Sequence, residues 1–210
     1  MTQSQHHYIA FEGSKRLASG TLEQVALKVK HVLDTRTQAR LLVFDQASSE
    51  LVDFDHRGSP EQMLKKLAHA PAGVQSDTSP PAADTVPVRP GRPRLGVVAR
   101  EVTLLPRHWE WLNSQPGGAS VSLRKLVEQA RRANQARDDV RIAGEATYRF
   151  MSAIAGHRTG FEEAARALFA GDMAHFWTLV SPWPADIRAH LQDLAAPAFE
   201  KHAVPDGHHV

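Results

Sequence analysis

The chain has 210 residues, 42% of them hydrophobic, which is enough for one to three compact units with real cores. It contains no cysteine, and this excludes disulfides, thiol nucleophiles and thiolate metal sites. The net charge is only +2, no run approaches the roughly 20 apolar residues of a membrane-spanning helix, and the polar start lacks the plan of a secretory signal. We therefore expect a cytoplasmic protein without a membrane partner.

The first part of the chain alternates β-prone runs with helical patterns. Residues 8–11 and 16–19 flank a turn at Gly13 and predict a hairpin. Thr21 then opens a helix, because Gln24 follows three residues later and completes a capping box. Apolar residues recur on one face of this helix, so we expect it to cover one face of a sheet.

A second hairpin and a second helix follow. Residues 41–44 and 51–54 are β-prone and are separated by a polar stretch. Ser59, Pro60 and Glu61 begin a helix that continues through Ala68. Together these elements predict a small ββαββα domain over residues 1–70, within an α+β protein.

Residues 71–94 form a predicted linker that ends in a basic arm. The stretch holds six prolines among small and polar residues, so little of it can be buried. Between Arg89 and Arg137 the chain carries ten basic residues against three acidic ones. This local excess of +7 leaves −5 for the rest of the chain and favours a polyanionic partner.

The central unit is predicted over residues 95–137. Residues 95–105 are β-prone, Pro106 suits the first turn of a helix with Trp109 and Leu112, and residues 115–118 form a turn. Ser120 or Ser122 can cap a second helix. This helix has a narrow apolar stripe, made of Leu123, Leu126, Val127 and Ala130. A unit of this size cannot bury the stripe alone, so we expect a homodimer.

This order of strand, proline-started helix, glycine turn and serine-capped helix resembles the ribbon-helix-helix repressors related to Arc and the methionine repressor. The resemblance implies that strands from two chains enter the DNA major groove and that the second helix holds a phosphate. By this resemblance Ser120 and Ser122 bind phosphate, and Arg100 and Thr103 lie near the ribbon.

The sequence Gly91-Arg92-Pro93-Arg94 resembles the core of AT-hook segments. Proline keeps such a segment extended and narrow. The resemblance implies that Arg92 and Arg94 lie along an A·T-rich minor groove, where the potential is most negative.

The last part of the chain is predicted to be a helical domain over residues 138–203, with a disordered tail at 204–210. A first helix runs from about 139 to 155, with Gly156 past its end. A capping box over residues 159–162 opens the next helix, Asp172 caps another, and a last helix continues through Leu194. These helices suit a small bundle. We expect the four tryptophans to pack in cores and interfaces.

Nearly the whole chain, from Tyr8-Ile9-Ala10-Phe11 through Leu105-Pro106-Arg107-His108-Trp109 to Trp183-Pro184-Ala185-Asp186, is similar to an uncharacterised bacterial protein family. This resemblance implies a bacterial protein but no particular activity.

We therefore predict a homodimeric protein that binds double-stranded DNA, as a transcriptional regulator. The predicted DNA contacts are Arg89, Arg92, Arg94, Arg100, Thr103, Arg107, Ser120, Ser122 and Arg124. The alternative is a protein-interaction adaptor whose basic middle is only a solvated hinge.

We do not expect catalytic activity. Asp45, Asp53, Asp55 and His56 are the only local group that suits acid–base catalysis or a hard cation, and no nucleophile or phosphate-binding glycine loop accompanies them. The histidines show no metal-binding spacing. We expect no enzyme, cofactor or metal, and an enzyme that uses Asp53 is the least favoured alternative.

Overall fold

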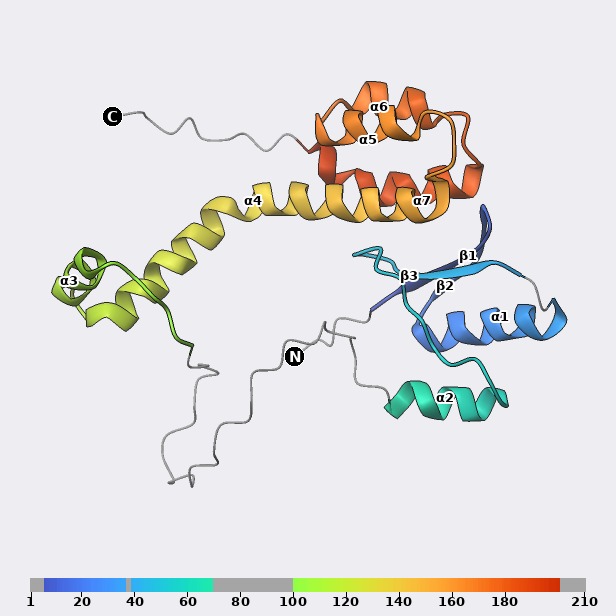
Figure 1. Cartoon of the computed structure of the whole chain (residues 1–210), viewed down its shortest axis with the longest axis horizontal. Coiled ribbons are helices and arrows are strands. Elements are labelled where there is room, and N and C mark those ends of the chain that lie inside the picture. The colour runs from blue at the N-terminus through green and yellow to red at the C-terminus, as the bar shows by residue number, and fades with distance from the viewer. Residues whose placement is uncertain (1–5, 37–38, 70–99, 201–210) are drawn as a thin grey trace. The chain divides into compact units, whose positions relative to one another are not determined.

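Figure 1 shows the computed structural model, which describes residues 6–36, 39–69 and 100–200. The chain divides into two units: unit 1 comprises residues 1–70 and 133–210, and unit 2 comprises residues 71–132. As predicted, the fold is α+β, with an N-terminal antiparallel sheet and a mainly helical C-terminal part. Across these described ranges, no helix combines the length and the hydropathy needed to cross a membrane.

The sheet of unit 1 has three strands in the order β2-β1-β3. Their bounds are β1 Tyr8–Glu12, β2 Lys15–Gly20 and β3 Leu41–Asp45. Both pairings are antiparallel, and Ala10 in the central strand lies opposite Ala18 on one side and Val43 on the other. The predicted first hairpin is confirmed.

The predicted second hairpin is wrong in its second half. Leu51 forms only an isolated bridge with Phe44, and the Val52 amide donates to the Val43 carbonyl at 2.8 Å, but residues 53–58 then leave the sheet edge. One reason is competition from helix α1, because Lys30 Nζ lies 3.4 Å from the His56 carbonyl oxygen and holds this segment near the helix. The domain is therefore ββαβα rather than ββαββα.

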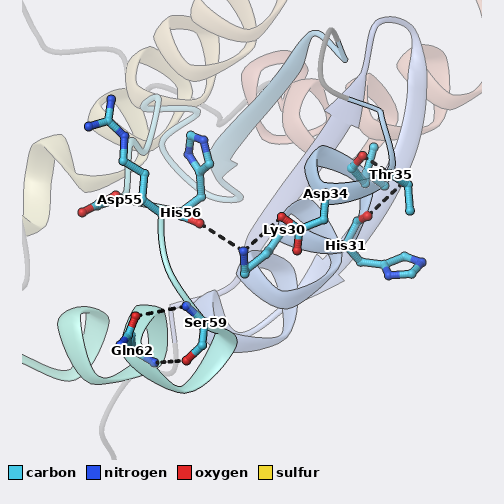
Figure 2. A network of polar contacts seen from close by, with 10 residues as sticks. Lys30, His31, Asp34, Thr35, Asp55, His56, Ser59 and Gln62 are labelled. Atoms are coloured by element: carbon cyan, nitrogen blue, oxygen red, sulfur yellow. Dashed lines mark hydrogen bonds and ion pairs between the residues drawn. The ribbon is translucent and has the colours of Figure 1, made fainter.

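Helix α1 (Leu22–Thr35) covers one face of the sheet, as its apolar spacing predicts. The predicted capping box is present: Thr21 Oγ1 accepts from the Gln24 amide, and Gln24 Oε1 accepts from the Thr21 amide. The buried residues of this layer are Ala10, Val25, Val29 and Val43. Helix α2 (Pro60–His69) begins after a similar reciprocal pair between Ser59 and Gln62, which Figure 2 shows.

The opposite face of the sheet packs against the C-terminal helices. These are the end of α4 (Gly118–Ala155), α5 (Phe161–Phe169), α6 (Met173–Val180), α7 (Ala185–Ala195) and the short 3-10 helix Pro197–Phe199. Phe150 of α4 lies 5.3 Å, between ring centroids, from both Phe11 and Phe44. The described parts of residues 1–70 and 138–203, predicted as two domains, thus share one hydrophobic core.

Local signals predict most of the helix ends in this part. Gly156 follows the end of α4, and Asp172 Oδ1 accepts from the His175 amide at 3.0 Å as the N-cap of α6. The capping box predicted at Thr159 is absent. Gly160, with φ +82°, occupies the N-cap of α5 without a side-chain bond. Instead the Thr159 carbonyl accepts from Trp183 Nε1 at 3.2 Å, so its backbone binds the segment between α6 and α7.

Helix α4 is one helix of 38 residues where the sequence pattern predicts two. The segment around the predicted boundary at 137/138 contains no glycine or proline that would end it. Ion pairs at helical spacing support it: Arg132 with Glu128 at 2.9 Å, and Arg141 with Glu145 at 2.9 Å. The helix begins at Gly118, so Ser120 and Ser122 lie inside its first turns and neither is its cap.

Unit 2 contains α3 (Pro106–Ser114) and the first part of α4. Pro106 stands at the start of α3, as predicted, and Leu112 is buried. Residues 100–105 belong to no strand. Because a ribbon strand needs a second chain to pair with, the predicted ribbon stays a prediction.

Candidate nucleic-acid interface

The basic side chains in the described part of unit 2 are exposed. They outnumber the acidic side chains there, Glu101, Glu110 and Glu128, by six to three. The six are Arg100, Arg107, Arg124, Lys125, Arg131 and Arg132. This surface is therefore suited to a polyanion.

Within the described ranges, four of these cations form no ion pair. They lie at three positions along the chain. Arg100 precedes α3, Arg107 lies in the first turn of α3, and Arg124 and Lys125 lie in the second turn of α4. Arg124 Nε donates to the Ser120 carbonyl at 3.0 Å, which orients its guanidinium along the helix. These side chains can approach phosphate without first giving up a carboxylate partner.

Arg131 and Arg132 share the carboxylate of Glu128. Arg131 Nη2 lies 3.0 Å and Arg132 Nε lies 2.9 Å from Glu128 Oε1. The hydrogen bond from Arg131, followed by that from Arg132, lowers the pKa of Glu128 below its ordinary value. These two arginines are already partly neutralised and would contribute less to phosphate binding than the four others.

The remaining predicted contacts differ in how well they are placed. Ser120 and Thr103 are exposed, whereas Ser122 is buried with 8% of its surface accessible, so a phosphate cannot reach it in this conformation. The predicted contacts Arg89, Arg92 and Arg94 lie outside the described residues.

Exposed apolar side chains in unit 2 are a feature that the sequence predicts only in part. The apolar spacing indicates the stripe on α4, yet the tryptophans are expected in cores. Trp183 is buried and Trp177 is half-buried, but Trp109 and Trp111 on α3 are 36% and 50% exposed. The alternating spacing of Trp109 and Trp111 is itself a signal, because residues two apart point to different sides of a helix.

The acidic group considered for catalysis is not assembled. Asp45 Oδ1 accepts from the Ala47 amide at 3.0 Å and from the Ser48 amide at 2.9 Å, which closes the turn after β3. Asp55 Oδ2 instead lies 2.6 Å from Lys66 Nζ of α2, and the His56 carbonyl accepts from Lys30 (Figure 2). Within the described ranges, no group of three or more potential ligands could hold a metal ion.

Unit 1 also contains a pocket of about 850 Å³ that no sequence pattern predicts. Asp45, Asp139 and Asp193 contribute carboxylates from the end of β3, from α4 and from α7, while Ile142 and Leu194 supply apolar surface. These residues are far apart in the sequence, and only the shared core brings them together.

Comparison with known proteins identifies a family. No curated protein and no solved structure matches the chain, so the resemblance to ribbon-helix-helix repressors gains no support. A family model described as "Uncharacterized protein conserved in bacteria (DUF2239)" matches residues 7–195. This range covers nearly all of the chain and agrees with the resemblance that spans the whole sequence. The chain therefore belongs to this bacterial protein family.

Proposed function

We propose that the protein binds double-stranded DNA through the phosphate backbone, with unit 2 as the contact surface. The observation that carries the proposal is the set of exposed cations Arg100, Arg107, Arg124 and Lys125. The stretch from Arg89 to Arg94 adds three more arginines beside them in the sequence. Backbone binding needs only such a density of accessible positive charge, because phosphates are the same at every base pair.

This proposal is narrower than base-specific reading. Phosphate contacts position a protein on a duplex, whereas sequence is read in the grooves. A regulatory role would need the paired ribbon or the insertion of Arg92 and Arg94 into a minor groove. These finer steps are proposals that rest on resemblance alone.

The test is the salt dependence of binding to a fluorescent random duplex, measured by anisotropy. We expect affinity to fall steeply with salt, because each neutralised phosphate releases counterions. In the triple variant R100A/R107A/R124A the slope of log K against log salt should decrease by about 1 for each arginine–phosphate pair that the substitutions remove. The variant R92A/R94A tests the basic arm in the same way.

The matched control is Arg141→Ala, which removes an exposed arginine from unit 1. Arg141 lies between Asp138 and Glu145, so its removal should leave DNA affinity unchanged. A decrease in the logarithm of affinity for the control that is about one third of that for the triple variant, in proportion to the charge removed, would reduce the effect to net charge. Binding that is absent at low salt would rule out the proposal.

A second candidate is a protein-docking role, and the exposed apolar side chains of unit 2 favour it. In that case the cations would serve only as a polar rim around an apolar contact. The two candidates differ in one measurement: apolar docking would resist salt, whereas phosphate binding would not.

A further inference from the structure

The pocket of unit 1 has the size and the lining of a small-molecule site. Its volume of about 850 Å³ lies within the range of roughly 300–1,000 Å³ that ligand sites occupy. Most of its surface is apolar, and a few polar side chains converge on it, as is usual for such sites. The lining comes from β3 and the turn after it, from α4, from α7 and from the 3-10 helix. We call this cavity the unit 1 pocket.

The ionisable side chains of the unit 1 pocket are mostly acidic. Four carboxylates line it, from Asp45, Asp139, Asp193 and Glu200. No lysine or arginine of the described residues joins them, and two histidines are the only other ionisable groups in the lining. Like charges repel at a binding surface, so this lining disfavours a phosphate or a carboxylate ligand and favours a cation.

Two of these carboxylates are available to a ligand. Asp45 is already engaged, because its Oδ1 accepts from the Ser48 amide and its Oδ2 lies 3.4 Å from His6 Nδ1. The exposed carboxylates of Asp139 and Asp193 form no hydrogen bond or ion pair within the described part of the chain. A cation can therefore reach them without displacing a protein partner.

Apolar surface lies beside each of the two available carboxylates. On α4, Asp139, Ile142 and Ala143 share one side of the helix by their spacing, and Ile142 is 51% exposed. On α7, Asp193 directly precedes Leu194, which also lines the pocket. Such a lining matches a ligand whose positive charges are joined by a hydrocarbon chain.

We propose that the unit 1 pocket binds an aliphatic diamine or polyamine. One ammonium group donates to the Asp139 carboxylate on α4 and another to the Asp193 carboxylate on α7, while the methylene chain covers Ile142 and Leu194. This inference goes beyond the proposed DNA binding and uses no residue of unit 2.

Other cations fit the unit 1 pocket less well. Within the described residues, no group of three or more potential ligands could hold a metal ion. Quaternary ammonium ligands are recognised by aromatic rings, and no described aromatic ring other than the histidines lines this pocket. Primary and secondary amines remain, because their N–H groups can donate to carboxylates.

The test is isothermal titration calorimetry of the full-length protein with putrescine and with spermidine. We expect saturable binding at one site. Asp139→Asn and Asp193→Asn should each weaken binding by roughly 10-fold, because the ammonium loses a charge-assisted hydrogen bond. Since both side chains are exposed, we expect the variants to fold, which thermal unfolding followed by circular dichroism checks.

A third variant tests the pocket without removing a carboxylate. Ile142→Lys places an ammonium group of the protein itself beside Asp139, and Ile142 is exposed enough to accept the longer side chain. This variant should weaken amine binding at least as much as the two asparagine variants.

The matched control is Asp138→Asn, which removes an exposed carboxylate one position away on α4 and outside the pocket lining. It should leave amine affinity unchanged. Butylamine, with one amino group, should bind more weakly than putrescine, and the diol with the same carbon chain should not bind. The variant R100A/R107A/R124A should bind amines like the wild type, so a failure of DNA binding would leave this inference standing.

Three results would overturn the inference. The first is the absence of saturable binding with both amines, which would mean that the pocket serves another occupant or none. The second is an equal decrease in affinity for Asp138→Asn and Asp139→Asn, which would indicate diffuse attraction to surface charge. The third is binding of the diol as tight as that of putrescine, which would exclude a role for the carboxylates.

Discussion

At the scale of single residues, His190 stands out as an imidazole inside the core. Only 1% of its surface is exposed, and its ring lies 4.6 Å from that of Phe150 and 6.0 Å from that of Phe11. Burial lowers the pKa of His190 to about 4; Asp193 opposes this shift and Arg16 adds to it. Its Nε2 has no hydrogen-bond partner within the described part of the chain. The core therefore holds the neutral form.

Because the folded protein holds His190 in its neutral form, we expect it to lose stability in mild acid. The unfolded chain takes up the proton near pH 6.5 and the folded chain only near pH 4, so unfolding gains protons between these values. The free energy of unfolding should decrease by on the order of 2 kcal/mol as the pH falls through this window. Urea titrations at pH 7 and pH 4.5 measure it.

His190→Leu should remove this component of the pH dependence, whereas His157→Leu, at an exposed histidine, should keep it. An unchanged acid response in the His190 variant would show that other groups cause the decrease.

Ser49 is a second residue held in an unfavourable state. It adopts φ +56°, a left-handed backbone conformation that residues other than glycine rarely adopt. Its Oγ is buried and finds no hydrogen-bond partner within the described residues. Ser49→Gly should raise the free energy of unfolding by about 1 kcal/mol, because it relieves the backbone and removes the unpaired hydroxyl.

Ser49→Ala separates the two causes, since it removes the hydroxyl but keeps the backbone strain. The increase in stability from glycine should exceed that from alanine in chemical denaturation. Equal effects of the two substitutions would contradict a contribution from the backbone.

At the scale of elements, Lys30 connects α1 to the segment that leads into α2. Its side chain is 9% exposed, and its Nζ lies 3.1 Å from Asp34 Oδ1 and 3.4 Å from the His56 carbonyl oxygen (Figure 2). Lys30→Met keeps the aliphatic stem but removes both bonds. We expect a decrease of about 1–2 kcal/mol in the free energy of unfolding and faster amide exchange in α2.

Lys28→Met on the exposed side of the same helix provides the control. Exchange in α2 that stays as slow as in the wild type would show that Lys30 does not hold this segment.

The same scale shows which elements the sequence can predict. Caps and breakers act within a few residues, so Thr21, Pro106, Gly156 and Asp172 mark their helix boundaries correctly. Residues 51–54 have strand propensity, but Lys30, more than twenty positions earlier in the chain, binds the His56 carbonyl and holds the following segment near α1. Tertiary contacts of this kind leave no local signal.

The candidate interface shows the same division. Charge predicts that Arg100, Arg107 and Arg124 are exposed, and they are. Ser122 is buried because α4 begins at Gly118. The sequence does not reveal this start, because the two adjacent glycines, both with positive φ, predict a turn at this position. Helical spacing predicts the α4 stripe, but it could not show that α3 leaves Leu126 and Val127 uncovered.

At the scale of the whole molecule, the burial pattern of the central strand β1 indicates how unit 1 is organised. Ile9, Ala10 and Phe11 are three consecutive buried residues, whereas a sheet with one solvated face would alternate. Phe11 packs toward the C-terminal helices and Ala10 toward α1. This run indicates a sheet covered on both faces, but it does not say which distant helices provide the second cover.

The two-sided burial of β1 bears on how the protein is made. The Arg16 amide donates to Asp186 across 170 positions of sequence, so the strands leave the ribosome long before the helices that will cover them. Until these helices are made, Phe11 and Phe44 have no neighbours on that side, and the nascent sheet exposes apolar side chains. Contacts this distant slow folding, which makes the time between translation of the two ends the period of greatest aggregation risk.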